Sequence, residues 1–263
     1  MALRVGIVGA GRAGRDRTAG LLTRPEVEVV GIADPNRPAR DAFAERFRIG
    51  LAVSDHHRLA VDSKVDAIYV CSPSATHYPV AMDALRSGKH VITEQPIALS
   101  VRDAEKLMAE AEKSGISLST ALPGRYDPAN QEAARIIDTD EIGFPFLGVL
   151  NRVENEFDRL NDWHDWMGTW DTGGGGILMY RGSEVVDVLR YLFGEVGAVS
   201  AMHSRFAIEP LNKAEDSCMI GLEFVEDIAA QIAMTGAARY SAWPEDYRGS
   251  ATRIEIYGPD GSI

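Results

Sequence analysis

The sequence predicts an α/β protein in two parts, a doubly wound parallel sheet followed by an α+β domain with a mostly antiparallel open sheet. Three observations lead to this fold class. Residues 3–34 read as a strand, a glycine-rich turn, the start of a helix and a second strand. Strand-like and helix-like stretches then alternate as far as residue 121, as in a parallel sheet covered by helices. From Leu122 onward, a helix, a strand and a loop are followed by one long helix and a series of strands.

The glycine-rich turn has the spacing and the surroundings of a dinucleotide site. Residues 3–8 form an apolar run typical of a buried parallel strand, and Gly9, Gly11 and Gly14 follow it as G-x-G-x-x-G. The first glycine permits the tight turn, the second lets a pyrophosphate approach the backbone, and the third lets the new helix pack closely on the strand. The start of that helix offers unpaired N–H groups and a partial positive charge to the phosphates.

A carboxylate at the end of the second strand completes this pattern. Asp34 lies 20 residues after Gly14, where an acid accepts hydrogen bonds from the adenosine ribose. Its charge would repel a 2′-phosphate, so NAD is the expected cofactor, although nearby Arg37 leaves NADP open. Arg12 and Ala13, inside the glycine turn, are also expected to contact the cofactor.

The other elements of the first part follow from apolar periodicity and from residues that end helices and strands. Ser100 is the expected N-cap of one helix, and Gly88 is the expected C-cap of another. We expect strands at residues 3–8, 27–33, 66–71, 90–93 and 116–121, and helices at 36–47, 78–87 and 101–113. Because a doubly wound sheet binds ligands at the carboxyl ends of its strands, residues 1–121 are predicted to be an NAD(P)-binding domain.

Residues 122–263 are predicted to form a second domain. We expect helices at 128–138 and after a glycine run at 173–176, and strands at 146–154, 198–208, 217–224, 228–235 and 252–257. Helices should cover one face of the resulting sheet. Residues 258–261 spell a turn of the kind that joins two strands. The chain stops soon afterwards at Ile263, which predicts a shortened domain or a sheet that another subunit completes.

Composition argues against several classes of protein. The net charge of −12 and the lack of a basic patch argue against nucleic acid as a partner. No apolar run reaches the length of a membrane span and no signal peptide opens the chain, so the cytoplasm is the expected location. Cys71 and Cys218 are too few for a disulfide framework, and Cys71 is expected to be a buried thiol. Pairs such as His56–His57 do not make a metal set, so no metal is expected.

Several motifs, spaced along the whole chain, indicate a known family. They are GIVGAGRAG at 6–14, Ala33-Asp34-Pro35, SPSATH at 72–77, GKHVITEQP at 88–96, GRYDP at 124–128, GGGILMYRGSEVVDVLRYLFG at 174–194 and RIEIYGPDGS at 253–262. With them, the chain resembles the family of glucose–fructose oxidoreductase, inositol dehydrogenase and MocA. The resemblance implies an N-terminal Rossmann domain and a C-terminal domain that binds substrate. It also implies a homodimer or homotetramer formed through the C-terminal sheet.

The resemblance further implies which residues border the nicotinamide end of the cofactor. They are Ser72, Pro73, His77, Glu94 and Gln95. His77 either lies near the nicotinamide or caps the helix that follows it. The peptide bond before Pro96 is often cis in relatives.

Three acid–base positions of the family carry other residues in this chain. Relatives have the lysine of an E-K-P motif where this chain has Gln95, a side chain that does not titrate. Relatives have an Asp and, one helical turn later, a His that face the same pocket. When the glycine run at 174–176 is aligned with the family's pattern, Tyr180 and Glu184 occupy these two positions. Proton transfer is therefore expected from Tyr180, Glu184 or His164, a loop histidine flanked by acids. Arg181 is next to Tyr180 but points about 100° around a helix from it.

Substrate contacts are expected mainly from the second domain. The expected residues are Arg125, Tyr126, Trp163, His164 and Tyr180. An ion pair is the alternative role for Arg125, and an ordinary surface position is the alternative for His164. The neighbouring tryptophans at 163, 166 and 170 either stack on a substrate ring or fill a small core.

The function implied is NAD(P)-dependent hydride transfer to or from a sugar, a polyol or a related hydroxy or keto small molecule. Two alternatives remain open. The first is a dinucleotide-binding regulator or inactive homologue, which the change of all three acid–base residues favours. The second is an enzyme that uses NAD for a transient oxidation during elimination or glycoside cleavage, with Glu184 as general acid or base.

Overall fold

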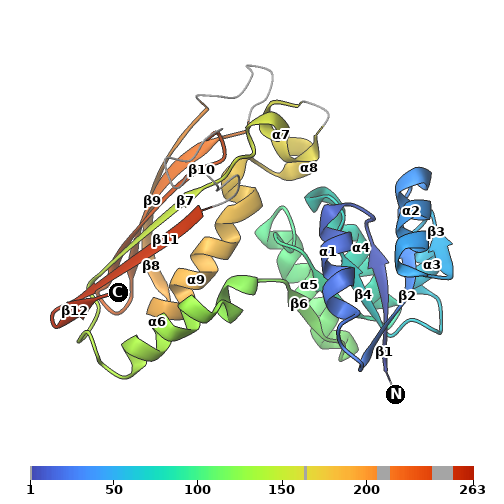
Figure 1. Cartoon of the computed structure of the whole chain (residues 1–263), viewed down its shortest axis with the longest axis horizontal. Coiled ribbons are helices and arrows are strands. Elements are labelled where there is room, and N and C mark those ends of the chain that lie inside the picture. The colour runs from blue at the N-terminus through green and yellow to red at the C-terminus, as the bar shows by residue number, and fades with distance from the viewer. Residues whose placement is uncertain (1, 163–164, 206–213, 239–250) are drawn as a thin grey trace. The chain divides into compact units, whose positions relative to one another are not determined.

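Two compact units make up the chain, Met1–Ala121 and Leu122–Ile263. The structure is a computed structural model, and it describes residues 2–162, 165–205, 214–238 and 251–263. Figure 1 labels the elements of both units. Two residues expected at the substrate site, Trp163 and His164, lie outside the described residues.

Unit 1 contains a six-stranded sheet in the order β3-β2-β1-β4-β5-β6, and every pair in it is parallel. The strands are β1 (Leu3–Val8), β2 (Val27–Ala33), β3 (Leu51–Val53), β4 (Ala67–Val70), β5 (His90–Thr93) and β6 (Leu118–Thr120). The chain steps outward from β1 to β3 and then returns to β4 on the other side of β1. The doubly wound parallel sheet predicted from the sequence is therefore confirmed, and its order reverses at the carboxyl end of β1, where such sheets bind ligands.

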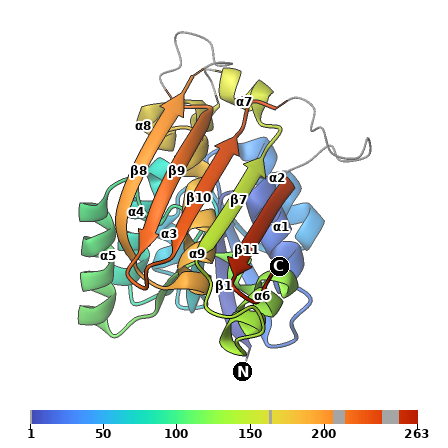
Figure 2. The ribbon, with the colours of Figure 1, turned by 90° about the vertical axis from the view of Figure 1, so that its left-hand side faces the viewer.

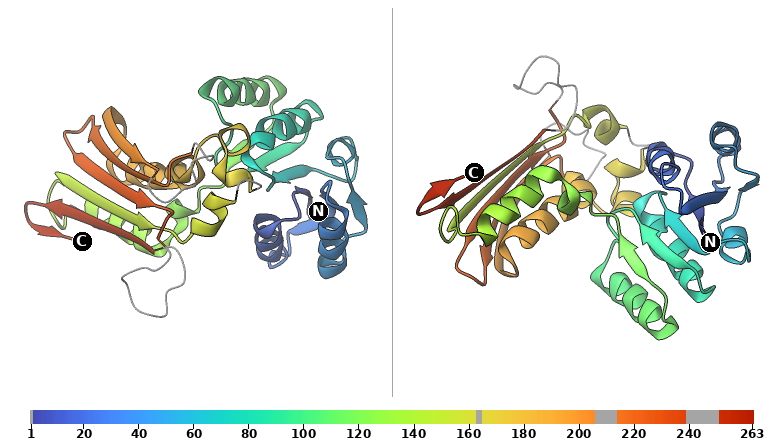
Figure 3. Two further views of the ribbon diagram at one scale, coloured as in Figure 1. Left: turned by 90° about the horizontal axis from the view of Figure 1, so that it is seen from above. Right: turned by 60° about the horizontal axis from the view of Figure 1, so that its bottom comes forward.

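Helices cover both faces of this sheet, as Figure 3 shows from above. On one face, α1 (Arg12–Leu21) and α2 (Arg37–Phe47) pack over Ile7 and Ile32. On the other face lie α3 (His57–Ala60), α4 (His77–Arg86) and α5 (Val101–Ser114). Because both faces are covered, β4 is buried at every position, which explains its continuous apolar sequence. The short β3 and α3 were not expected from the sequence, since three or four residues show no clear periodicity.

Of the two expected helix caps, Ser100 is confirmed and Gly88 was placed one residue too late. Ser100 Oγ accepts a hydrogen bond from the Asp103 N–H at 3.1 Å and so caps α5. Helix α4 has Ser87 as its C-cap, and Gly88 follows with a φ of +75°, the left-handed conformation that glycine adopts freely.

Unit 2 contains a mixed six-stranded sheet in the order β12-β11-β7-β10-β9-β8. The strands are β7 (Leu147–Val153), β8 (Val196–Ser204), β9 (Ser217–Phe224), β10 (Ala229–Thr235), β11 (Ala251–Gly258) and β12 (Gly261–Ser262). Among the strand pairs of the described residues only β7–β10 is parallel, so the expectation of a mostly antiparallel sheet is confirmed. The predicted turn at 258–261 joins β11 to β12, where Tyr257 pairs with Ser262. The end of the strand expected at 198–208 reaches beyond the described residues.

Helices α6 (Pro128–Asp138) and α9 (Ser183–Phe193) lie against one face of this sheet, and Figure 2 shows them behind its strands. They pack on alternate residues of the strands, such as Leu150 and Ile232, which are 1% and 0% exposed. The single long helix expected after the glycine run instead begins with a π-helical turn, η4 (Leu178–Gly182), that leads into α9. Short helices not expected from the sequence are η2 (Pro123–Tyr126), α7 (Phe157–Asn161), η3 (Trp166–Gly168) and α8 (Trp170–Gly173).

Candidate functional site

The three glycines in the turn from β1 into α1 are needed for different structural reasons. Gly9 has a φ of +108°, and a Cβ added to it would lie 2.6 Å from the Cys71 carbonyl oxygen. A Cβ on Gly14 would lie 2.0 Å from the carbonyl oxygen of Gly9. A Cβ on Gly11 would meet no heavy atom within 4 Å. The fold itself therefore requires glycine at 9 and 14, whereas Gly11 leaves open space above the backbone.

That open space lies at the amino end of α1. Within this fully described stretch, Gly11 is the N-cap, no side chain caps the helix, and its first turn contains no acidic residue. Its first N–H groups and the positive end of the helix dipole are thus left for an anion. A pyrophosphate group fits such a site in charge and in shape.

Asp34 lies beside the same turn, directly after β2. Its Oδ2 accepts a hydrogen bond from the Ala10 N–H at 2.7 Å, and its Oδ1 accepts one from the Asn36 N–H at 2.7 Å. Each carboxylate oxygen still has a lone pair for a ribose hydroxyl. Arg37, expected near this end of the cofactor, is exposed and forms an ion pair with Asp41 at 3.3 Å. Arg12 is also exposed, with its Nε 4.0 Å from Asp16.

His77 joins the two loops expected at the nicotinamide end. It is 1% exposed, and its Nδ1 and Nε2 each lie 2.7 Å from a backbone carbonyl oxygen, those of Pro96 and Ser72 respectively. His77 is also the first residue of α4, but its side chain does not cap that helix. It therefore fixes the loop after β4 to the loop after β5, in which the Gln95–Pro96 peptide bond is cis.

Glu94, next to Gln95, has two partners that the sequence did not suggest. Arg17 on α1 donates from Nε and Nη2 to the two carboxylate oxygens of Glu94 at 2.6 and 3.0 Å. Tyr69 on β4 donates its hydroxyl to Glu94 Oε1 at 2.9 Å. One signal in the sequence was the position of Arg17, three residues after Gly14. Residues spaced by three or four lie on one face of a helix, so Arg17 was to be expected on the face of the helix that contains Gly14. The Glu94 carboxylate is thus held by protein groups.

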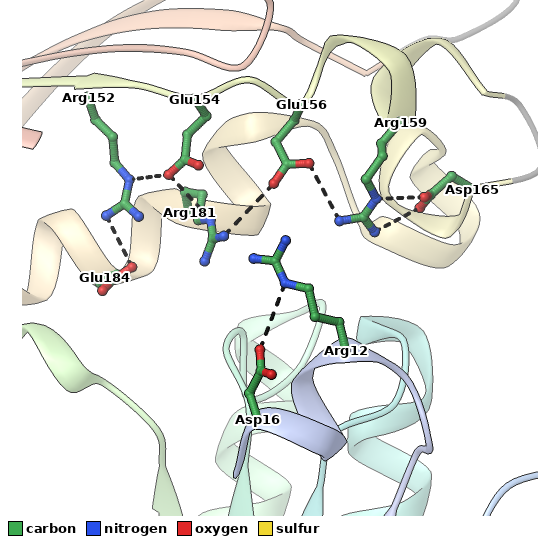
Figure 4. A network of polar contacts seen from close by, with 9 residues as sticks. All are labelled: Arg12, Asp16, Arg152, Glu154, Glu156, Arg159, Asp165, Arg181 and Glu184. Carbon is green, nitrogen blue, oxygen red and sulfur yellow. Dashed lines mark hydrogen bonds and ion pairs between the residues drawn. The ribbon is translucent and has the colours of Figure 1, made fainter. Parts of the chain in front are cut away.

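A chain of ion pairs runs through unit 2, along the end of β7 and the start of α9 (Figure 4). Arg152 Nε lies 2.7 Å from Glu154, and its Nη1 lies 3.1 Å from Glu184. Further along, Arg181 lies 3.5 Å from Glu154 and 3.9 Å from Glu156, and Arg159 contacts Glu156 at 3.6 Å and Asp165 at 2.8 Å. Glu154, Glu156 and Arg152 are each less than 9% exposed. Buried charges require such pairing, so the network orders these side chains.

Tyr180, in the π-helical turn η4, lies against the same network. The guanidinium of Arg181 lies over the Tyr180 ring, 4.3 Å from its centroid, and that of Arg159 lies 5.9 Å away. The edge of Trp166 completes the surroundings, with ring centroids 5.8 Å apart. The expectation that Arg181 would point away from Tyr180 was wrong, because its long side chain folds back over the ring. Tyr180 and Glu184, expected to face one pocket, thus both contact the ion-pair network.

The remaining expected substrate residues differ in their surroundings. Arg125 forms two hydrogen bonds of 2.7 Å with Asp187 on α9 and lies over the ring of Tyr191, so the ion-pair alternative is present. Tyr126 is 77% exposed. Trp166 packs in a small core with Leu160 and Met167, and Trp170 is 55% exposed. Roles for these residues toward a substrate stay predictions.

The glycine run before η4 allows a close approach within unit 2. A Cβ on Gly176 would lie 1.7 Å from the carbonyl oxygen of Glu215. The side chain of Glu215 accepts hydrogen bonds from the N–H groups of Gly176 and Leu178 at 3.0 and 2.9 Å. Glu215, which the sequence did not single out, therefore holds the segment that carries Tyr180.

Two histidines outside these sites, His56 and His57, lie beside acidic residues. His56 Nε2 lies 3.0 Å from Asp83 on α4, and the rings of His56 and His57 stack with centroids 4.3 Å apart and an interplanar angle of 29°. Ligand atoms of Asp55, His56 and His57 all lie within 4.8 Å of one another. One carboxylate and two imidazoles at this spacing are a possible set of metal ligands, so the expectation of no metal stays a prediction.

Comparison with known proteins gives the family. Residues 3–122 match a family profile described as "Oxidoreductase family, NAD-binding Rossmann fold", and residues 130–263 match one described as "GFO/IDH/MocA C-terminal domain". The chain belongs to the GFO/IDH/MocA family. This assignment confirms the resemblance inferred from the motifs and makes unit 1 an NAD-binding Rossmann domain of that family.

Individual relatives of this family member are dehydrogenases and reductases. It is 26% identical to the scyllo-inositol 2-dehydrogenase (NAD(+)) of Bacillus subtilis (strain 168), a match covering 99% of this chain and 73% of that protein. It is also 26% identical to the 1,5-anhydro-D-fructose reductase of Ensifer adhaerens, covering 99% and 74%. A solved structure of levoglucosan dehydrogenase in complex with NADH and levoglucosan shares the fold, with a TM-score of 0.89 at 23% identity, covering 100% of this chain and 72% of the other.

Two further expectations concern membrane-spanning helices and the state of the two cysteines. Every helix within the described ranges is too short or too polar to traverse a lipid bilayer. Cys71 and Cys218 are both buried free thiols, as expected for Cys71, and burial raises the pKa of the Cys218 thiol to about 11. A protonated, buried thiol is a poor nucleophile, so neither cysteine has the surroundings of a reactive one.

Proposed function

We propose that this protein is an NAD(P)-dependent oxidoreductase that transfers hydride to or from a carbinol carbon of a sugar, a polyol or a related hydroxy or keto small molecule. The observation that carries the proposal is the glycine cradle, in which Gly11 leaves open space at the uncapped end of α1 beside the Asp34 carboxylate. Family membership and the printed activities of the relatives support the same class of reaction.

The proposed roles follow the order of the cofactor's parts. Gly9, Gly11 and Gly14, with Arg12 and Ala13 between them, bind the pyrophosphate, and Asp34 binds the adenosine ribose. The loops after β4 and β5, which His77 connects, border the nicotinamide. When bound, the nicotinamide ring would accept or donate the hydride. Gln95 serves there as a hydrogen-bonding group, since an amide does not titrate.

Proton transfer is assigned to the second unit. Tyr180 is the preferred group, because two guanidinium groups lie over its ring and η4 holds it against a buried network. Glu184, paired with Arg152, and His164 are the other two groups in this assignment. Hydride removal from a carbinol requires a proton acceptor beside the hydroxyl, which gives these side chains their role.

One assay separates this proposal from its alternatives. Purified protein is mixed with NAD+ or NADP+ and a panel of sugars and polyols, and reduced nicotinamide is followed by absorbance. Turnover with one panel member supports the dehydrogenase. Cofactor binding without turnover favours a regulator or an inactive homologue, and product formation without net reduced cofactor favours the transient oxidation.

We also propose a homodimer or homotetramer formed through the outer face of the unit 2 sheet, in the cytoplasm. Met202 on β8 and Met219 on β9 pair across the strands on that face and are 68% and 47% exposed. Met202→Asp should lower the mass measured by light scattering, because a charge would be buried at the interface. Met108→Asp, at a methionine that is 56% exposed on α5 of unit 1, is the matched control. An unchanged mass for both variants would contradict this interface.

A further inference from the structure

A polar cluster lies at the carboxyl edge of the unit 1 sheet, outside the turn of Gly9 and Gly11. It consists of Arg17, Tyr69 and Glu94, and it is called the Arg17 clamp below. Arg17 donates two hydrogen bonds to the two carboxylate oxygens of Glu94, at 2.6 and 3.0 Å, and Tyr69 donates a third at 2.9 Å. A guanidinium that donates two parallel hydrogen bonds to a carboxylate fixes both the distance and the orientation of its partner.

The Arg17 clamp is partly buried, and its two donor side chains stay protonated. The side chains of Arg17 and Glu94 are 37% and 15% exposed, and Tyr69 is 7% exposed. The hydrogen bond to Glu94 raises the pKa of Arg17, and burial together with the Glu94 charge raises the pKa of Tyr69. Arg17 therefore stays a cation, and Tyr69 stays a hydrogen-bond donor, across the physiological pH range.

The clamp joins three elements that carry opposite ends of the cofactor site. Arg17 is on α1, whose first turn contains Gly14 and whose amino end is the anion site. Glu94 follows β5 directly, its N–H donates to the Val70 carbonyl oxygen at 2.9 Å, and it precedes Gln95. Tyr69 comes from β4, the strand between β1 and β5. The clamp thus links α1 and β4 to the residue that directly precedes Gln95.

We propose that Arg17 is a positioning residue for the nicotinamide end of the cofactor. It acts through Glu94, which it holds at a fixed distance from the helix that binds the pyrophosphate, and so fixes where Gln95 lies along the cofactor. The inference rests on the proposed function, in which the loop containing Gln95 borders the nicotinamide. Arg17 itself is not a catalytic residue in this proposal.

The test compares two ligands that differ only at the nicotinamide end. NADH carries the nicotinamide, and ADP-ribose lacks it, while both present the same pyrophosphate and adenosine. For Arg17→Met we expect the affinity for NADH to fall about tenfold, because a charged hydrogen-bonded pair is broken, and the affinity for ADP-ribose to change less than about twofold. The fluorescence of bound NADH should shift toward that of free NADH. Calorimetry measures the affinities, and a melting curve verifies that the variant is folded.

Further variants keep the test decisive if Arg17→Met folds poorly. Arg17→Lys keeps the charge without the two-pronged geometry, and Tyr69→Phe removes only one donor, so each should give a smaller effect in the same direction. In the double variant Arg17→Met with Glu94→Gln, the second change should add little to the first, since both break one interaction. Arg86→Met, which disrupts the looser Arg86–Glu110 pair at 4.0 Å, is the control and should leave both affinities unchanged.

Two results would overturn the inference while leaving the proposed function intact. One is an equal loss of affinity for NADH and ADP-ribose in Arg17→Met, and the other is full additivity in the double variant. Folded wild-type protein that binds neither ligand would overturn the proposed function, and this inference with it.

Discussion

A Gly11→Ala variant should fold as the wild type does and bind NAD+ at least about tenfold more weakly, a loss of about 1.4 kcal/mol. The added Cβ meets no protein atom within 4 Å, so nothing in the fold opposes it. Gly11 has a φ of −69°, which any residue adopts, and the N-cap change costs less than about 1 kcal/mol of stability. The methyl group would occupy space that the pyrophosphate needs. Calorimetric titration with NAD+ and a thermal melt measure the two effects separately.

Two other glycines serve as controls for this result. Gly20, near the end of α1, also has open space around an added Cβ, and Gly20→Ala should leave NAD+ binding unchanged while gaining about 0.5–1 kcal/mol of stability. Gly14→Ala should destabilise the protein, because its Cβ would lie 2.0 Å from a backbone oxygen. Wild-type affinity in a folded Gly11→Ala variant would show that the cofactor does not lie against this turn.

Replacement of Tyr180 by phenylalanine should lower the turnover number about 10²–10⁴-fold, the usual range for loss of a general acid–base group. The affinity for NAD+ should not change, because Tyr180 belongs to unit 2 and the cofactor cradle to unit 1. The ring and its contacts with Arg181 and Trp166 are retained in phenylalanine, so the fold should persist. Steady-state kinetics on the substrate identified by the panel gives the turnover number.

Tyr191→Phe is a matched control, since Tyr191 is on α9 and also lies beneath a guanidinium, that of Arg125 at 5.7 Å. It should retain full turnover. Glu184→Gln tests Glu184 as a second candidate, because glutamine keeps the shape of the side chain that pairs with Arg152. If Tyr180→Phe turns over at the wild-type rate, Tyr180 does not transfer the proton.

The parts of the fold predicted correctly from the sequence depend on local signals. The strand β5 at 90–93 and the helix α6 at 128–138 have the predicted bounds, since apolar periodicity and capping residues such as Asp127 are encoded within a few positions. The glycine spacing likewise predicted the turn before α1. Gly9 and Gly14 are required by backbone atoms close to them in sequence or on the adjacent strand, and Gly11 faces open space.

The parts that sequence reasoning missed depend on contacts between distant residues. Arg17 and Glu94 are 77 positions apart, and Arg125 and Asp187 are 62 apart, so no local pattern pairs them. The position of Arg181 over Tyr180 depends on the π-helical turn and on where a long side chain folds, neither of which an ideal helical wheel includes. The role of a charged side chain thus depends on which residue it contacts in the folded chain. For these pairs, the three-dimensional structure identified the partner.

The central claim is that the turn of Gly9, Gly11 and Gly14 and the Asp34 carboxylate hold a nicotinamide dinucleotide. Calorimetric titration of the folded wild-type protein and of Asp34→Ala with NAD+ tests it most directly. We predict saturable binding of one NAD+ per chain, clearly weaker binding to Asp34→Ala, and displacement of NAD+ by ADP-ribose. A folded wild-type protein that gives no saturable signal with NAD+ or NADP+ would contradict the claim.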